Sequence, residues 1–267
     1  MEDPLAGLHV EQHGTGPALV LAHGFAGSAR NWRPQVRALR ESHRVVVYDS
    51  RGHARSDAPE DPKVYSEAAL VRDLGAIVGA CGDAHPVVGG LSMGAAVALA
   101  WALAEPATPR GLILASLPAG PGSGRGVSAH SEAFAAALDL EGVDAAGARF
   151  AWGPGSGLDE LGAALVRQGF LEHPPHGLAH ILREFLGRRA TPAELAPRLQ
   201  ALNVPTLVLA GELDKASLPA SRELAGLLPR ARLEVIPAAG HVVNLAQPAA
   251  VNSVIHAFLV ALDGEED

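Results

Sequence analysis

The 267-residue sequence contains a single cysteine, and aromatic residues make up only 4% of the chain. One thiol cannot form an intramolecular disulfide, so nothing in the sequence favours a disulfide-stabilised, secreted fold. Basic residues do not gather in clusters, and the net charge of −8 opposes binding to a polyanion. The sequence therefore predicts no nucleic-acid partner.

We also expect neither a leader nor a membrane-spanning segment. The chain begins Met-Glu-Asp-Pro, without the basic and apolar regions of a signal peptide, so we expect a cytoplasmic protein. Residues 87–104 carry no charge, but they contain glycines and a serine, and acidic residues (Asp83 and Glu105) flank them. We interpret this stretch as a buried strand, a tight turn and a buried helix, and we expect no membrane partner.

The remaining composition is that of a globular protein with a large core: 48% of the residues are hydrophobic and 19% are charged. Short runs rich in valine, leucine and isoleucine alternate with longer segments of helical periodicity, such as residues 66–80 and 248–262. The sequence therefore predicts an α/β fold with a doubly wound, mostly parallel sheet covered on both faces. The expected strands are residues 18–22, 45–48, 86–89, 111–115, 206–210 and 232–236.

This alternation stops between residues 120 and 191. Glycine-rich runs at residues 120–126 and 153–157 oppose regular structure, but the pattern between and after them is helical. We predict an α/β core made of residues 1–119 and 192–267 and a helical cap, or lid, made of residues 120–191. The cap holds five of the chain's eleven aromatic residues, which are Phe134, Phe150, Trp152, Phe170 and Phe185.

The motif Gly90-Leu-Ser92-Met93-Gly94 lies between an apolar strand and a helical run. A serine at such a sharp turn takes a strained backbone that holds its hydroxyl clear of the sheet, and its neighbours must be small. The following helix directs its positive end at a developing oxyanion, and the Met93 N–H is one candidate donor. The alternative is a glycine-rich turn without function, since the chain has 30 glycines.

A second small-residue loop, His23-Gly-Phe25-Ala-Gly-Ser28, follows the first expected strand. Its position predicts that the Phe25 N–H is the second donor of an oxyanion hole. We expect His23 itself to brace the loop through hydrogen bonds.

An acid and a base follow two later strands, in Gly-Glu212-Leu-Asp214 and Pro-Ala-Ala-Gly-His241. Parallel sheets place their sites on such loops. A serine becomes a good nucleophile when a neutral imidazole takes its proton and a buried carboxylate orients that imidazole. We therefore predict Ser92 as the nucleophile, His241 as the base and Asp214 as the acid, with Glu212 as the rival acid.

With these residues in place, the sequence resembles the α/β-hydrolase superfamily over nearly its whole length. Residues 49–56, Asp-Ser-Arg-Gly-His-Ala-Arg-Ser, are similar to the family's D-x-R-G-x-G-x-S loop, with Ala54 in place of a glycine. Ala95 likewise follows the turn Gly90-Leu-Ser92-Met93-Gly94, which corresponds to the family's nucleophile elbow, at a position where many members have glycine. The resemblance is strongest to small esterases, cofactor-free perhydrolases and carbon–carbon bond hydrolases. A serine at the elbow separates this chain from epoxide hydrolases and haloalkane dehalogenases, which use aspartate there.

Together these features predict a hydrolase that cleaves small, uncharged esters of short to medium acyl length through an acyl-enzyme on Ser92. No cluster of histidine, cysteine and acidic residues has the spacing of metal ligands, so we expect neither a metal nor an organic cofactor. The side chains expected to bind the substrate are Leu91, Phe134, Trp152, Phe170 and Phe185.

Two alternatives use the same fold. Residues 204–214 also resemble synthases of the menaquinone pathway, which suggests a lyase or carbon–carbon hydrolase acting on a carboxylated substrate. Such a substrate needs a fixed cation, for which Arg51, Arg125 and Arg183 are candidates. The second alternative, from a different class, is a hydrolase-fold receptor that binds a ligand and turns it over very slowly.

Overall fold

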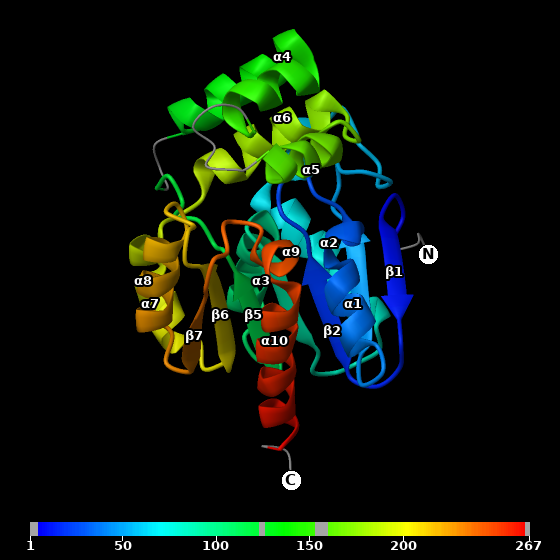
Figure 1. The fold of residues 1–267 in the computed structure, drawn as a ribbon, viewed down its shortest axis with the longest axis vertical. Helices are drawn as coiled ribbons and strands as arrows, with labels where there is room; N and C mark the ends of the chain where they lie inside the picture. Colours follow the sequence, from blue (N-terminus) through cyan, green and yellow to red (C-terminus); the bar gives the residue numbers. More distant parts are fainter. Residues whose placement is uncertain (1–4, 123–125, 153–159, 265–267) are drawn as a thin grey trace.

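A computed structural model of the protein describes residues 5–122, 126–152 and 160–264 (Figure 1). Its centre is a seven-stranded sheet in the order β1-β3-β2-β4-β5-β6-β7, and every neighbouring pair is parallel except β1 with β3. The predicted doubly wound, mostly parallel α/β fold is therefore confirmed. The strands are β1 (His9–His13), β2 (Ala18–Ala22), β3 (Arg44–Asp49), β4 (Val87–Leu91), β5 (Gly111–Ala115), β6 (Thr206–Gly211) and β7 (Ala231–Ile236).

Six of these strands match the predicted ones to within two residues at each end, and β1 was missed. The sequence of β1, His-Val-Glu-Gln-His, has no apolar run, because this strand lies at the edge of the sheet and is only half-buried. The helix predicted from Ser66 is confirmed as well, since Ser66 Oγ accepts a hydrogen bond from the Ala69 amide and caps the first turn.

Helices cover both faces of the sheet, because successive strand residues point to opposite sides and both sides are apolar. One face is covered by α2 (Glu67–Ala80), α3 (Met93–Ala104), α7 (Pro192–Ala201) and α8 (Leu218–Leu227). The other face is covered by α1 (Arg33–Leu39), α9 (Val243–Ala246) and α10 (Pro248–Asp263). Among the described residues, the 3-10 helices η1 (Ala29–Trp32) and η2 (Pro62–Tyr65) complete this part of the fold, and a third, η3 (Leu186–Arg188), lies within residues 120–191.

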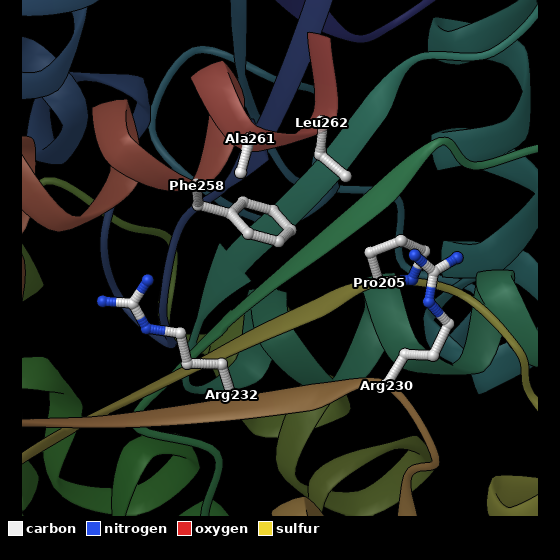
Figure 2. Close-up of a pocket in the computed structure, with 6 residues that line it drawn as sticks. All are labelled: Pro205, Arg230, Arg232, Phe258, Ala261 and Leu262. Carbon is white, nitrogen blue, oxygen red and sulfur yellow. The ribbon is translucent and has the colours of Figure 1, made fainter. Parts of the chain in front are cut away.

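A cavity of about 310 Å³ lies beside the last turns of α10 (Figure 2). Pro205 and Arg230, which line it, come immediately before β6 and β7, so the cavity opens at the amino ends of the parallel strands. Sites in parallel sheets form at the opposite, carboxyl ends. The remaining lining residues are Arg232, Phe258, Ala261 and Leu262.

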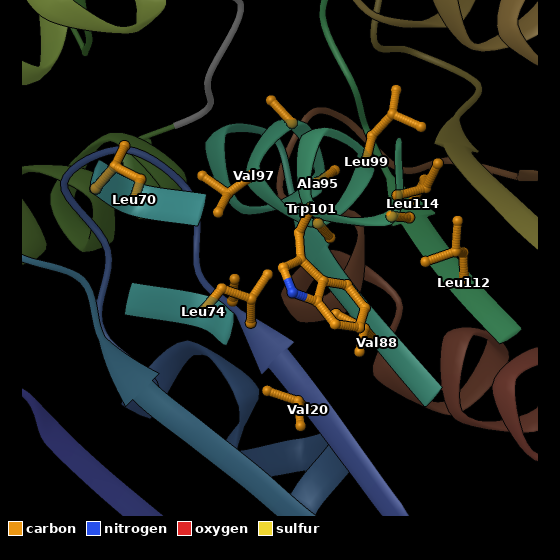
Figure 3. Packing of buried hydrophobic residues seen from close by; sticks show 14 of the residues in the cluster. Val20, Leu70, Leu74, Val88, Ala95, Val97, Leu99, Trp101, Leu112 and Leu114 are labelled. Atoms are coloured by element: carbon orange, nitrogen blue, oxygen red, sulfur yellow. The ribbon is translucent and has the colours of Figure 1, made fainter. Parts of the chain in front are cut away.

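Helix α3 is apolar on all sides and nearly all of its residues are buried. Figure 3 shows Val20, Val88 and Leu112 of neighbouring strands directed towards α2 and α3, which contribute Leu74 and Trp101. This packing fixes the start of α3 relative to the sheet. The residue at the junction of β4 and α3, Ser92, is therefore held on a rigid base.

Three further helices lie together beyond the carboxyl ends of the strands: α4 (Ala129–Phe150), α5 (Glu160–Phe170) and α6 (Pro175–Glu184) (Figure 1). They share an apolar cluster of their own. Helix α4 is broken at Gly142, whose φ of +79° is the left-handed conformation that favours glycine. Helix α6 contacts the loop after β3. The two backbone segments approach so closely that a Cβ on Gly177 would lie 2.8 Å from the Gly52 oxygen.

Candidate active site

Ser92 lies between β4 and α3 with a φ of +53° and a ψ of −108°, a conformation that is strained for any residue except glycine. Its amide donates a 2.8 Å hydrogen bond to the Ala115 oxygen of β5, which holds the turn in place. A Cβ on Gly90 would lie 2.3 Å from the carbonyl carbon of Gly94, and one on Gly94 would lie 2.3 Å from the Ala22 oxygen. Both glycines of the motif are therefore required by the close approach of three chain segments.

Three side chains form a continuous hydrogen-bond chain at the carboxyl edge of the sheet. His241 Nε2 lies 2.9 Å from Ser92 Oγ, and His241 Nδ1 lies 2.8 Å from Asp214 Oδ2. A carboxylate can only accept, so Nδ1 carries the hydrogen and Nε2 accepts from the Ser92 hydroxyl. In this arrangement the serine proton can pass directly to the imidazole.

Asp214 is 5% exposed and ionised in spite of its burial. Burial by itself raises the pKa of this carboxyl, but hydrogen bonds from His241 and Ser217 outweigh burial and lower the pKa below its ordinary value. Glu212 does not contact the imidazole: its carboxylate accepts a 3.0 Å hydrogen bond from the Ala238 amide. Between the two candidate acids, the structure places Asp214 against His241.

The loop that carries Phe25 lies beside Ser92, since a Cβ on Gly24 would lie 3.5 Å from the Ser92 Cβ. His23 braces this loop, because its Nδ1 donates to the Gly24 oxygen at 2.7 Å and its Nε2 accepts from the Ser50 amide at 2.9 Å. The amides of Phe25 and Met93 donate no hydrogen bond to any other residue that the structure describes. Both amides are therefore available to an oxygen atom of a ligand.

His23 also belongs to a row of three buried histidines that joins this loop to the segment between α5 and α6. The ring centroids of His23 and His53 are 5.0 Å apart, and those of His53 and His173 are 5.2 Å apart. His173 Nδ1 accepts a 2.8 Å hydrogen bond from the amide of Ala54, whose φ of +45° is a left-handed conformation that is strained for alanine. Burial lowers the pKa of all three rings, that of His23 to about 4, so all are neutral near pH 7.

This histidine row predicts acid sensitivity. In the unfolded chain a histidine binds its proton near pH ~6.5, whereas folded His23 does so only near pH 4. Between these values the unfolded state binds more protons, so the free energy of unfolding falls as the pH decreases. His23 alone accounts for a loss of about 2 kcal/mol between about pH 7.5 and about pH 5. Urea denaturation curves at the two pH values measure this loss.

A His53→Phe variant provides the control, because it keeps an aromatic ring in the row and removes one group that titrates. Its stability should depend less on pH than that of the wild type over the same interval, which lies above the titration range of most carboxylates. An equal pH dependence in the two proteins would show that the histidine row is not responsible.

Three of the aromatic residues expected to bind substrate lie over Phe25. Its ring packs edge-to-face against Phe134 and Phe170, with centroids 5.9 and 5.7 Å away, and Trp152 packs against Phe170 at 5.2 Å. These side chains belong to the apolar cluster shared by α4, α5 and α6, against which Phe25 packs, and Phe134 and Phe170 are themselves only 5% and 6% exposed.

Leu91 and Phe185 are not part of this aromatic cluster, and their role in substrate binding stays a prediction. Phe185 is 1% exposed and belongs to the large core cluster that also contains side chains of the sheet, α2 and α3. Leu91 is 3% exposed and packs on the opposite face of the sheet. Apolar periodicity identifies buried side chains but does not reveal whether they face a core or a ligand.

Two of the arginines considered as anchors for a substrate carboxylate already have acidic partners. Arg51 pairs with Asp73 at 2.8 Å. Arg183 pairs with Glu132 at 2.9 Å and with Asp139 at 2.6 Å. Arg125 lies outside the described residues. The guanidinium groups of Arg51 and Arg183 are therefore already paired with carboxylates of the protein and not free to bind an anionic substrate.

Within the described ranges, no group of three or more histidine, cysteine or acidic side chains is arranged to hold a metal ion. None of the helices in this part of the chain has both the length and the apolar character needed to cross a bilayer.

Comparison with known proteins agrees with this fold. A putative carbamate hydrolase, RutD, of Variovorax paradoxus is 34% identical over 94% of this chain and 96% of its own length. A putative 2-succinyl-6-hydroxy-2,4-cyclohexadiene-1-carboxylate synthase of Bacillus subtilis is 30% identical over 92% and 91%. The structure of a thermophilic esterase from Thermogutta terrifontis superimposes with a TM-score of 0.83 at 31% identity, covering 96% of this chain and 93% of the esterase. The model of the alpha/beta hydrolase family matches residues 19–254, and the chain is an enzyme of that family.

Proposed function

We propose that this protein is a serine hydrolase that cleaves carboxylic esters through an acyl-enzyme on Ser92. The observation that carries the proposal is the continuous hydrogen-bond chain from Ser92 Oγ through His241 to Asp214. In the first step Ser92 Oγ attacks the ester carbonyl while His241 Nε2 takes its proton. The amides of Phe25 and Met93 donate to the oxyanion, and the alcohol leaves with the proton from His241.

The second step repeats this chemistry with water. His241 removes a proton from a water molecule, which attacks the acyl-enzyme and releases the acid and the free Ser92 hydroxyl. Asp214 keeps the imidazole in the tautomer with Nδ1 protonated and stabilises the imidazolium that forms in each step. Its buried, ionised carboxylate suits this role.

The proposed cap comprises residues 120–191, of which the described helices are α4, α5 and α6. Their place beyond the carboxyl ends of the strands and the aromatic contacts with Phe25 support a cap that covers the acyl group. Aromatic walls with few polar groups are typical of pockets for uncharged ligands. A short to medium, uncharged acyl chain is the substrate class that such walls accept best.

Truncating the aromatic wall should change acyl preference. We expect Phe134→Ala and Trp152→Ala each to shift the ratio of kcat/KM between acetyl and hexanoyl esters, by about 1 to 3 kcal/mol for each methylene group whose fit to the wall changes. Phe258→Ala is the matched control, because it removes a mostly buried aromatic side chain at the opposite end of the sheet. Acyl preference that is identical in all four proteins would contradict a substrate-binding role for these aromatics.

A panel of p-nitrophenyl esters, a thioester, a lactone, an aryl carbamate and a vinylogous diketo acid, assayed on wild type and Ser92→Ala, tests the proposed reaction. We expect the esters to be the best substrates and mass spectrometry to detect an acyl group on Ser92. Turnover confined to the diketo acid would favour the lyase or carbon–carbon hydrolase alternative, against which the paired Arg51 and Arg183 argue. Tight binding with very slow turnover of every compound would favour a ligand receptor.

A further inference from the structure

Ser217 is a fully buried residue, directly before α8, that the mechanism above does not use. Its amide donates to Asp214 Oδ1 at 3.1 Å, and the Leu218 amide donates to the Asp214 backbone oxygen at 3.0 Å. The hydroxyl of Ser217 does not cap α8. Asp214 therefore accepts the hydrogen bonds of the backbone amides at the start of α8. The Ser217 hydroxyl is not needed there and has another partner.

That partner is the imidazole of His241. Ser217 Oγ lies 3.1 Å from His241 Nδ1, which is also 2.8 Å from Asp214 Oδ2. Nδ1 carries a single hydrogen, so the carboxylate accepts the shorter arm of a shared hydrogen bond and Ser217 Oγ accepts the longer arm. The hydroxyl hydrogen of Ser217 is then directed to the Asp214 carboxylate, whose charge it helps to stabilise.

The imidazole needs such a restraint, because packing alone does not fix it. The His241 side chain is 39% exposed and lies on a loop that follows Ala238, a residue with a φ of +53°. Hydrogen bonds from Nδ1 to both Asp214 Oδ2 and Ser217 Oγ restrict rotation of the imidazole ring more than a single hydrogen bond would. The direction of Nε2 towards Ser92 depends on that plane.

We propose that Ser217 is a positioning residue for the reaction at Ser92: its hydroxyl links the Asp214 carboxylate to His241 Nδ1 and so holds Nε2 in line with the Ser92 hydroxyl. This role rests on the proposed function, in which His241 removes the Ser92 proton. Ser217 acts through Asp214 and His241 and does not touch the substrate.

Ser217→Ala tests the role, and Ser221→Ala is its matched control. Ser221 is equally buried, lies one turn further along α8, and its hydroxyl has no hydrogen-bond partner among the described residues. We expect Ser217→Ala to lower kcat by about tenfold, the effect of one hydrogen bond to a charged group, with KM unchanged. Ser221→Ala should change both constants less than about twofold. A rise in KM with unchanged kcat, or equal effects of the two variants, would overturn the proposal.

A fluorophosphonate probe separates this proposal from the choice of ester as substrate. Ser92 Oγ forms a bond to phosphorus as the phosphorus–fluorine bond breaks, fluoride leaves, and His241 takes the serine proton. Modification therefore requires an activated Ser92 but no ester. We expect Ser217→Ala to slow the modification about tenfold even if no ester in the panel is cleaved. Equal rates in wild type and Ser217→Ala would overturn the role of Ser217 alone, whereas a wild-type Ser92 that never reacts would overturn both proposals.

A double-mutant cycle shows whether Ser217 acts through Asp214. In the Asp214→Asn background, Ser217→Ala should slow the modification less than about twofold, because the link to the carboxylate is already lost. A full tenfold effect in that background would mean that Ser217 acts by another route. If Ser217→Ala does not fold, Ser217→Cys keeps the shape of the side chain with a weak donor and should show the same dependence on Asp214.

Discussion

Ser92→Ala and His241→Ala are each expected to lower kcat by about 10⁴- to 10⁶-fold, and the double variant should be little slower than either single variant. Each substitution breaks the same step, since without Oγ there is no nucleophile and without Nε2 nothing accepts its proton. The measurement is steady-state hydrolysis of the best ester in the panel.

Both variants should keep the fold. Alanine at position 92 has the same φ of +53° to adopt as serine, so the strain is unchanged. His241 is partly exposed, so its truncation leaves no large cavity. We expect the unfolding free energy of Ser92→Ala to match the wild type to within about 0.5 kcal/mol. His241→Ala should stay folded but lose about 1 to 3 kcal/mol, because the buried Asp214 carboxylate loses its hydrogen bond from His241. Ester hydrolysis by folded Ser92→Ala at a rate near that of the wild type would rule out Ser92 as the nucleophile.

The second large effect is expected from Asp214→Asn, which should lower kcat by about 10⁴-fold with little change in KM. An amide can present its NH₂ group to Nδ1 and so favour the wrong imidazole tautomer, and it carries no charge to stabilise the imidazolium. KM is spared because Asp214 is almost completely buried, behind His241.

Glu212→Gln is the matched control for this substitution, as it makes the same chemical change two residues earlier. Glu212 is bonded to the Ala238 amide and not to the imidazole, so we expect kcat within about threefold of the wild type. A large loss in Glu212→Gln together with a small one in Asp214→Asn would reverse the assignment of the acid.

The similar proteins are named for different kinds of substrate, so similarity to them does not identify the acyl group of the proposed ester substrate. A putative synthase, a putative carbamate hydrolase and an esterase share this fold and about a third of its residues. A fold places a reactive group but does not choose its substrate. In this chain that choice is expected to depend on α4 and α5, whose aromatic side chains Phe134 and Phe170 meet Phe25.

The sequence by itself determined the elements whose signals are local. Strand β5 was predicted at residues 111–115 and found at Gly111–Ala115, because a strand covered on both faces reads as one apolar run between polar flanks. The motif around Ser92 is equally local, because Gly90 and Gly94 stand where backbone segments approach too closely for any side chain. The order of strands and loops then placed Ser92, Asp214 and His241 at one edge of the sheet, although their catalytic roles stay predictions.

Only the tertiary structure decided which side chains meet across long stretches of sequence. Ser92 and His241 are 149 residues apart, and His173 reaches Ala54 over 119 residues. No periodicity distinguished Phe185, which packs in the core, from Phe134, which packs on Phe25. Ser217 likewise carries no signal in the sequence beyond its place three residues after Asp214. Contacts of this kind depend on how helices and loops pack around the finished sheet, which local patterns of apolar and polar residues do not encode.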